Sequence, residues 1–534
     1  MSILSVTIWC LLAHINKDTN TSIDTITSIK TVTDIITGIN KMPSLLLLPN
    51  EVLQEVVDLL LDSSTSDTIL SLAFVNRALR STVQYRQHKV LRIPPRLDPE
   101  FFEANIDNLF GAYLSSLEAR DLLPAVRSIE LVLNGPRHYN QYFWDALYRL
   151  VPTAKGLQNI HVCIPVSDPT SFSSPLVKLL DILQSRMPLV GVYAKLRSPL
   201  SGFPPLQVFR DFRNLYALEY TVYKSRDFRN APEILPLLKN ILRTCPNLRI
   251  LKLYTRTARA RRQMRFLSYQ PTYADKERPR CLETLELQDT NNWATADLPP
   301  DLWDPNFDQL SGNYDDSWFE KFFDWSKLHH LRIKEVTLLP YLTKKLTGLK
   351  SFEAPNASGY DRRDVKKFLL DLPSRLERIK LPIWSFIPLQ SLMEYGPTLR
   401  VLHFTHSSMM YPGHELTAYK IQLIRAFCPC LEEFGLSVRR QSRWPEGIMD
   451  ALSSFPKLSS LTIITRFCEV EDSYTSPTRE DLTQPYITFS EVRNLYNRLS
   501  RKLSGKNTLK RLKVQCYTPE WKSPRWWETT FGCP

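Results

Sequence analysis

Apolar residues recur with one spacing along most of the chain. In thirteen windows, an apolar residue at offset zero is followed by apolar residues at offsets three and five, with a side chain of different character between them at offset four. This alternation is typical of a half-buried β-strand, whose successive side chains point to opposite faces. The windows begin at Val126, Leu157, Leu189, Leu215, Leu248, Leu282, Leu328, Leu349, Leu376, Leu399, Leu431, Leu458 and Leu509.

Prolines and helical segments lie between the windows. Pro246, Pro397, Pro429 and Pro456 each stand two residues before a window, where a proline that ends a helix is expected. The stretches 363–372 and 490–503 have helical spacing. Strand and helix in alternation predict an α/β fold, an irregular leucine-rich-repeat-like solenoid over residues 126–520. The alternative is a conventional layered α/β domain.

Offset four of each window predicts a row of side chains on the strand face opposite to the core. In a solenoid such positions align across neighbouring strands into a concave row, the surface that repeat proteins use to hold partners. The bland alternative is that solvent-facing strand positions are simply polar. We predict target binding by Glu219, Lys252, Glu286, Arg332, Glu353 and Lys380, within a row that also contains Glu130, His161, Tyr193, His403, Gly435, Thr462 and Lys513.

The N-terminal part of the chain has a different, helical pattern. Residues 1–41 show no sustained stripe, so we expect a disordered segment or an upstream extension before a true start at Met42. Two short amphipathic helices follow within 42–90, and a helical linker is expected over 91–125. One helix begins near Pro49, and the second carries Leu72, Val75 and Leu79 at steps of three or four. Two helices of this size bury little core alone and need a partner.

These residues resemble the F-box. The family pattern is Leu-Pro, one residue, Glu and an aliphatic pair, followed after a loop by Leu and a Val-Cys/Ser-Arg/Lys-x-Trp/Phe block. Leu48, Pro49, Glu51, Val52 and Leu53 match the first part, and Leu72 with Val75–Leu79 matches the second. Asn76 and Leu79 depart from the commoner residues. The alternative is an ordinary helical hairpin that caps the downstream domain.

The windows likewise resemble the uneven leucine-rich region of fungal F-box proteins. The resemblance implies a non-catalytic substrate receptor of a Skp-cullin-F-box ubiquitin ligase, cytoplasmic or nuclear, with a Skp adaptor, a cullin bound through it, and an unknown target as partners. It implies adaptor contacts by Leu48, Pro49, Val52, Leu53, Val56, Leu72, Val75 and Leu79. Two alternatives remain: a basic scaffold that binds nucleic acid, and an F-box protein that acts outside a ligase.

The formal charge of +13 raises nucleic-acid binding as a possibility, but it is unevenly distributed. Residues 254–281 hold eight Lys/Arg and two acids, and residues 493–534 hold ten and two, whereas 296–324 hold eight acids and one Lys. Internal compensation between neighbouring segments is at least as good an explanation as phosphate binding. The tryptophans of the segment 521–534 predict an aromatic cap or tail that covers an open solenoid end.

Signatures of catalysis and of metal or membrane binding are sparse. The chain contains no GxGxxG, GxxxxGK or GxSxG motif, and no apolar run approaches the length of a spanning helix. His403 and His406 fall on opposite faces of a predicted strand, which disfavours a shared metal. Cys245, Cys281 and the Cys428/Cys430 pair are interpreted as buried structural thiols. We therefore expect no cofactor and no metal.

Overall fold

The structure is a computed structural model, and it describes part of the chain. The described residues are 89–93, 116–118, 122–133, 141–164, 170–197, 205–210, 212–223, 240–242, 244–256, 281–289, 324–333, 336, 339–355, 357, 361–405, 416–438, 440, 443–466, 487–503, 509–517 and 526–532. Residues 1–88, which include every predicted adaptor contact, lie outside them, as do the predicted boundary at Met42 and most of the acidic and basic segments between 257 and 323.

The chain is a mixed α/β protein that divides into two compact units. Unit 1 comprises residues 1–163 and 178–191, and unit 2 comprises residues 164–177 and 192–534. In unit 1, strands β1 (Val90–Ile93), β2 (Ser128–Val132) and β3 (Asn159–Ile164) pair in parallel in chain order. Helix α7 (Gln141–Thr153) connects β2 to β3, and the short 3-10 helix η3 (Leu123–Ala125) precedes β2.

The strands of unit 2 also pair in chain order. All of them are parallel except the last, which returns antiparallel to its neighbour. They are β4 (Gly191–Arg197), β5 (Leu215–Tyr223), β6 (Ile250–Arg256), β7 (Thr284–Asp289), β8 (His330–Ile333), β9 (Ser351–Glu353), β10 (Arg378–Leu381), β11 (Val401–Phe404), β12 (Glu433–Ser437), β13 (Ser460–Arg466), β14 (Arg511–Tyr517) and β15 (Trp526–Gly532).

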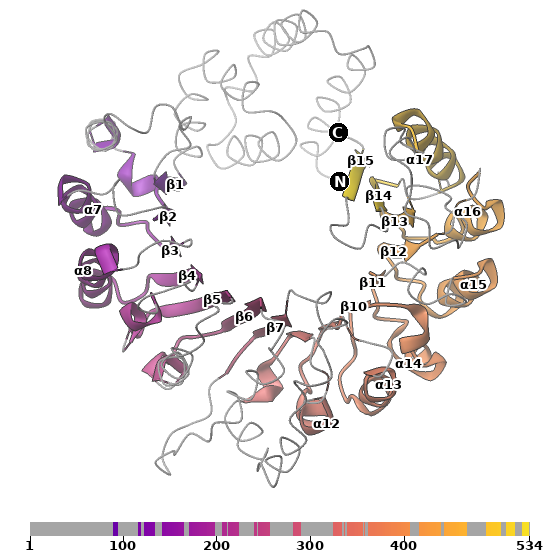
Figure 1. The fold of residues 1–534 in the computed structure, drawn as a ribbon, viewed down its shortest axis with the longest axis horizontal. Helices are drawn as coiled ribbons and strands as arrows, with labels where there is room; N and C mark the ends of the chain where they lie inside the picture. The colour runs from indigo at the N-terminus through magenta and orange to yellow at the C-terminus, as the bar shows by residue number, and fades with distance from the viewer. Residues whose placement is uncertain are drawn as a thin grey trace, which may run out of the picture. The chain divides into compact units, whose positions relative to one another are not determined.

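Helices between the strands cover one face of the unit 2 sheet (Figure 1). The α-helices are α12 (Leu339–Leu342), α13 (Arg362–Asp371), α14 (Leu389–Tyr395), α15 (Ala418–Phe427), α16 (Glu446–Leu452) and α17 (Phe489–Leu503), while α8 (Thr170–Arg186) contributes residues to both units. The 3-10 helices are η5 (Pro205–Phe209), η12 (Trp325–Lys327), η14 (Thr343–Lys345) and η16 (Trp384–Phe386).

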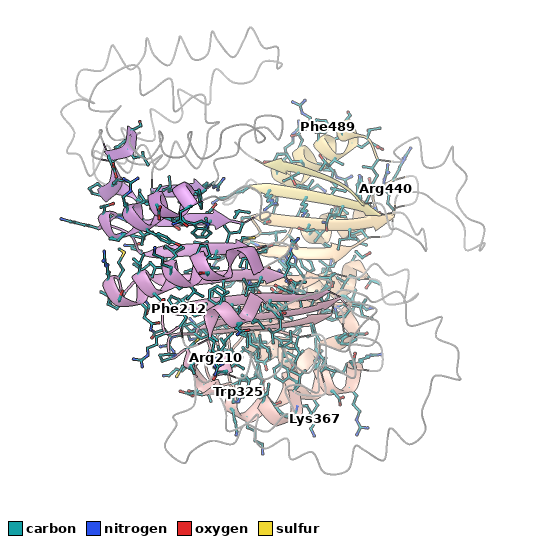
Figure 2. The ribbon with its side chains drawn as sticks, turned by 60° about the vertical axis from the view of Figure 1, so that its left-hand side comes forward. Arg210, Phe212, Trp325, Lys367, Arg440 and Phe489 are labelled. Atoms are coloured by element: carbon teal, nitrogen blue, oxygen red, sulfur yellow. The ribbon has the colours of Figure 1, made fainter. Side chains whose placement is uncertain are left out.

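The predicted windows account for the core. Twelve of the thirteen window-starting residues are buried, and strands β2 to β14 begin two residues after the window start, with β5 as the one exception. The apolar residues at offsets three and five pack against the helices, as the period of two requires. Aromatic residues fill the turns that precede the strands; Phe212 and Trp325, both labelled in Figure 2, are buried there.

Both helices predicted from their spacing are present. Helix α17 buries Val492, Leu495, Leu499 and Leu503, which recur every three or four residues along one side. A capping box closes its N-terminus, because the backbone N–H of Thr488 donates to Glu491 at 2.8 Å and the N–H of Glu491 donates to the Thr488 hydroxyl at 3.2 Å. Helix α13 occupies 362–371, one residue earlier than predicted.

Three features differ from the sequence-based expectation. The residues Val90–Ile93 form a strand paired with β2, although a helical linker was expected from residue 91. The tail forms strand β15, so its residues extend the sheet edge through backbone pairing with β14. Leu189 is 96% exposed and the neighbouring Val190 is buried in its place, so the third window fails at its first position, while Val192 and Ala194 at offsets three and five are buried.

Candidate functional site

A row of alternating charges crosses unit 2 on the sheet face opposite to the helices. We call it the charged row, and its members lie in register on successive strands from β4 to β11: Lys195, Glu219, Lys252, Glu286, Arg332, Glu353, Lys380 and His403. The register continues through Gly435 and Thr462 to Lys513. All six predicted target-binding residues therefore lie side by side, as the window spacing requires.

Ion pairs link most neighbours in the charged row. Lys195 Nζ lies 2.7 Å from Glu219 Oε1, and Lys252 Nζ lies 2.6 Å from Glu286 Oε1. Arg332 lies between two carboxylates, 3.8 Å from Glu286 and 3.6 Å from Glu353. Lys380 Nζ completes the series at 3.1 Å from Glu353 Oε1. Opposite charges on directly opposed strand positions stabilise a sheet, whereas like charges there destabilise it.

The carboxylates at the centre of the row are buried. Glu286 is 5% exposed and Glu353 is 4% exposed, whereas the side chains of Lys252, Arg332 and Lys380 keep roughly a third of their surface in solvent. Both glutamates lie in the predicted row, but they do not fit the alternative that its positions are simply polar because they face solvent. The reason is cross-strand pairing, since long cationic side chains from both neighbouring strands lie over each carboxylate.

The cluster around Glu286 sets its protonation. Burial alone raises the pKa of the Glu286 carboxyl, but hydrogen bonds from Lys252 and Tyr254, with the charge of Arg332, outweigh burial and hold that pKa below its ordinary value. The Tyr254 hydroxyl donates to Glu286 Oε2 at 3.0 Å, and burial together with the carboxylate raises the pKa of this tyrosine. Glu286 is thus an ionised, multiply bonded acceptor.

His330 lies beside this cluster. Its Nδ1 is 2.8 Å from the Ser351 hydroxyl on the adjacent strand. Burial lowers the pKa of His330, although the charges of Glu353 and Glu286 act in the opposite direction. The imidazole is therefore neutral over a wider range of pH than a solvated histidine.

The charged row ends at a histidine that is held in place. His403 Nε2 lies 2.9 Å from Glu433 Oε1, and this contact lowers the pKa of the Glu433 carboxyl. The His403 ring lies over Gly435, where a Cβ would come within 2.8 Å of ring atom Cγ. Glycine is therefore the residue that allows His403 to lie across strand β12.

A second set of ion pairs lies where the strands begin. The rim pairs, as we call them, are Arg249–Glu283, Lys350–Glu377 and Arg400–Glu432, at 3.9, 3.6 and 3.8 Å. Each residue immediately precedes the first residue of its strand. Their side chains are 33–62% exposed, so the same sign alternation occurs here in solvent. The rim pairs were not predicted, although the alternating signs at offset one of the windows indicate them.

The structure corrects the register at β4. Glu219 lies opposite Lys195, and the predicted member Tyr193 lies opposite Ala217 instead. A β-bulge between Val192 and Tyr193 shifts the pairing there. In unit 1, Glu130 and His161 lie in register with Arg92, which pairs with Glu130 at 2.8 Å.

A basic group near the C-terminal end was also missed. Arg440 (labelled in Figure 2) is 7% exposed, pairs with Glu491 of α17 at 2.6 Å and stacks on the Trp444 ring. On the adjacent helices, Arg498 and Lys502 pair with acids of α16. Part of the C-terminal basic segment is thus neutralised by intramolecular ion pairs, which does not favour a nucleic-acid surface on α17.

The cysteines and histidines considered for metal binding or thiol chemistry differ in their burial and placement. Cys245 and Cys428 are buried, whereas Cys281 and Cys430 are half-buried, which corrects the expectation that all four are buried thiols. His406 lies outside the described residues, so the relation between the two histidines is not described. Within the described ranges, no group of three or more His, Cys, Asp or Glu side chains is arranged to hold a metal, and no helix is long and apolar enough to cross a membrane.

Comparisons with known proteins find matches among solved structures. No family model matches the sequence, and no curated protein does. Among solved structures, the chain is similar to one described as the crystal structure of the Rad7 and Elc1 complex in yeast. The TM-score is 0.34 and the identity 14%, with 82% of this chain and 98% of that chain covered.

Proposed function

We propose that this protein is the substrate-recognition subunit of a Skp-cullin-F-box ubiquitin ligase. The observation that carries the proposal is the F-box-like pattern from Leu48 to Leu79 directly before a long array of strand–helix units. The array has parallel strands in chain order and a buried residue at nearly every window start, which supports an irregular leucine-rich-repeat-like solenoid. Such arrays present one extended sheet face to a partner.

In this role the chain is not itself catalytic. The F-box helices would dock on a Skp adaptor and, through it, on a cullin, while the array holds a target protein. Binding both at once raises the local concentration of a target lysine near the conjugating enzyme. The chain would then act in the cytoplasm or the nucleus, where these partners are found. An F-box protein acting outside a ligase would share the adaptor contact and lack the ubiquitination step.

Target contact on the charged row would use its half-exposed members. Glu219, Lys252, Arg332 and Lys380 keep solvent-accessible surface, whereas Glu286 and Glu353 hold the cations in place from beneath. A row that is internally neutralised attracts no partner by net charge. A target would therefore be recognised by matched hydrogen bonds to the fixed cationic side chains.

The adaptor contact is tested by a pull-down of the full chain with a Skp adaptor. Leu53→Asp and Val75→Asp each place a charge on the predicted apolar docking face and should abolish adaptor recovery. Gln54→Asp, on a polar position of the same predicted helix, is the matched control and should retain it. Unchanged recovery of Leu53→Asp at normal expression would reject the proposal.

Salt dependence separates this function from nucleic-acid scaffolding. An apolar helical interface changes little between low and moderate salt, whereas phosphate binding weakens steeply.

Affinity purification followed by mass spectrometry should recover the adaptor, a cullin and a target together. Recovery of adaptor without cullin would point to a role outside a ligase.

A further inference from the structure

Three large apolar side chains are exposed on two neighbouring helices of unit 2. Leu370 on α13 is 40% exposed, and Leu389 and Met393 on α14 are 47% and 57% exposed. Helix α14 packs between α13 and α15. Exposed apolar residues are ordinary when scattered singly, but adjacent ones mark interaction sites.

The strand register places two of these residues at equivalent positions. Leu370 and Met393 each lie eight residues before the first residue of the strand that follows, and those first residues, Arg378 and Val401, are register partners. Arg425 holds the same position on α15, eight residues before Glu433, the register partner of Val401. Leucine, methionine and arginine therefore follow one another across three helices. We call the surface of Leu370, Leu389, Met393 and the exposed cations beside them the α13–α14 face.

The charge of these helices is predominantly positive. Helices α13, α14 and α15 together hold six Lys/Arg and three acids, a net of +3. Four of the cations, Arg362, Arg363, Lys366 and Lys367, lie in the first six residues of α13. Arg363 and Lys367 are exposed, and Figure 2 labels Lys367 on the helical side of the unit.

This placement does not serve the stability of α13. Cations near a helix N-terminus oppose the helix dipole, which favours acids there. Burial and the charge of Arg362 also lower the pKa of Lys366. Arg362 has a structural role, since its Nε donates to the carbonyl of Ser385 at 2.9 Å. Asp361 at the N-cap and Asp364 in the first turn offset only part of the charge of the four cations. Local conflicts of this kind concentrate at functional surfaces.

We propose that the α13–α14 face docks an acidic amphipathic helix of a partner protein. The apolar side chains would pack against the apolar stripe of that helix, and the cations of α13 and Arg425 would face its carboxylates. A second copy of this chain is disfavoured as the occupant, because the exposed cations Arg363, Lys367 and Arg425 outnumber the exposed acids Asp371 and Glu394, and two such faces repel. Nucleic acid uses the cations but has no need for exposed leucine and methionine. This surface lies on the helical side, away from the charged row, and does not depend on the proposed ligase function.

The test uses the full chain and synthetic peptides followed by fluorescence anisotropy. The probe is a labelled peptide with leucines at positions i, i+3, i+4 and i+7 and glutamates elsewhere. One control peptide has the same composition with the leucines shuffled, and a second has lysine in place of glutamate. The probe should bind at least about tenfold more tightly than either control, because both the stripe and the charge are required.

Variants of the chain assign the binding to the surface. Met393→Glu and Lys367→Glu should each weaken probe binding about tenfold with an unchanged thermal midpoint, since both residues are exposed. Met393→Leu should bind like the wild type, and Lys510→Glu, an exposed lysine before β14, is the matched charge control. Absence of probe binding, equal binding of the shuffled peptide, or binding insensitive to Met393→Glu would overturn the proposal. Duplex DNA or phosphatidylserine vesicles that bind more tightly and are released by Lys367→Glu would overturn it in favour of phosphate recognition.

Discussion

The charged row and the rim pairs place alternating charges on some of the same strands of unit 2, yet they differ in burial. In the charged row, the central carboxylates of Glu286 and Glu353 are almost fully buried beneath their cations. In the rim pairs, every side chain remains at least 33% exposed. Because solvent screens exposed pairs and burial makes the loss of a partner costly, the two sets should differ in energy despite their similar geometry. Alternating signs along a row therefore do not show how much each ion pair contributes to the free energy of unfolding.

The largest effect is expected at Arg332. Arg332→Glu places a third carboxylate between Glu286 and Glu353 and removes the cation that both share. We expect a loss of about 2 kcal/mol in the free energy of unfolding, less than for a fully buried pair because a third of Arg332 is exposed. Urea unfolding followed by circular dichroism measures it. Arg400→Glu in a rim pair is the control and should change stability by about 0.5 kcal/mol or less. An equal loss of stability in both variants would contradict the energetic difference between the charged row and the rim pairs.

A smaller effect is expected from Glu286→Gln. The amide keeps the shape but loses the charge that Lys252 and Arg332 face, so the expected loss at neutral pH is about 1–2 kcal/mol. The folded-state pKa of Glu286 lies below its ordinary value, so its contribution is present above the unfolded pKa and is lost as pH falls through the folded pKa. The stability difference between wild type and variant should therefore shrink below about pH 4. A difference that stays constant down to acid pH would contradict this assignment.

Gly435→Ala tests how the charged row ends. The new Cβ would meet the His403 ring, which Glu433 holds in place, and the expected loss is about 1 kcal/mol. The loss should disappear in the His403→Ala background, because the obstacle is then gone. Thermal unfolding of the two single variants and the double variant measures the coupling, and additive losses would show that His403 does not cause the effect.

The smallest effect concerns His330. Its folded-state pKa is lowered mainly by burial, with Glu353, Glu286, Lys252 and Arg332 as the charged groups that face it. The unfolded chain therefore takes up the proton first, and stability declines as pH falls below about 6.5. His330→Asn can keep the hydrogen bond to Ser351 and should lose this slope between about pH 6.5 and 5. An identical dependence of stability on pH in the wild type and the variant would contradict the lowered pKa of His330.

Strand positions and the charged row could be predicted because both follow from a period of two. Apolar residues at offsets three and five, such as Leu402 and Phe404, are buried against the core, and offset four between them then falls on the opposite face. The burial of Glu286 and Glu353 could not be predicted, because it depends on which cations lie on the two neighbouring strands. The distances between neighbouring windows vary from 21 to 51 residues and do not indicate how the strands pair.

Three features of the structure were not predicted from the window pattern, each for a physical reason. Between β4 and β5, Lys195 opposes Glu219 and Tyr193 opposes Ala217, and a β-bulge between Val192 and Tyr193 interrupts the register that equal window spacing assumes. Strand β1 is only four residues long. Leu91 and Ile93 hold offsets three and five, but the residue at offset zero is His88, so the window pattern misses this strand. The α13–α14 face was not predicted either, because its members come from two helices that only the strand register aligns. The predicted adaptor contacts lie outside the described residues and stay a prediction.

Paired double-mutant cycles test most directly whether burial makes the ion pairs of the charged row contribute more to stability than the rim pairs. One cycle combines Lys252→Met with Glu286→Gln, and the other combines Arg400→Met with Glu432→Gln, each measured as the coupling in the free energy of unfolding. We predict a coupling of about 1.5 kcal/mol for the first pair and about 0.5 kcal/mol or less for the second. Equal coupling in the two pairs would contradict the account.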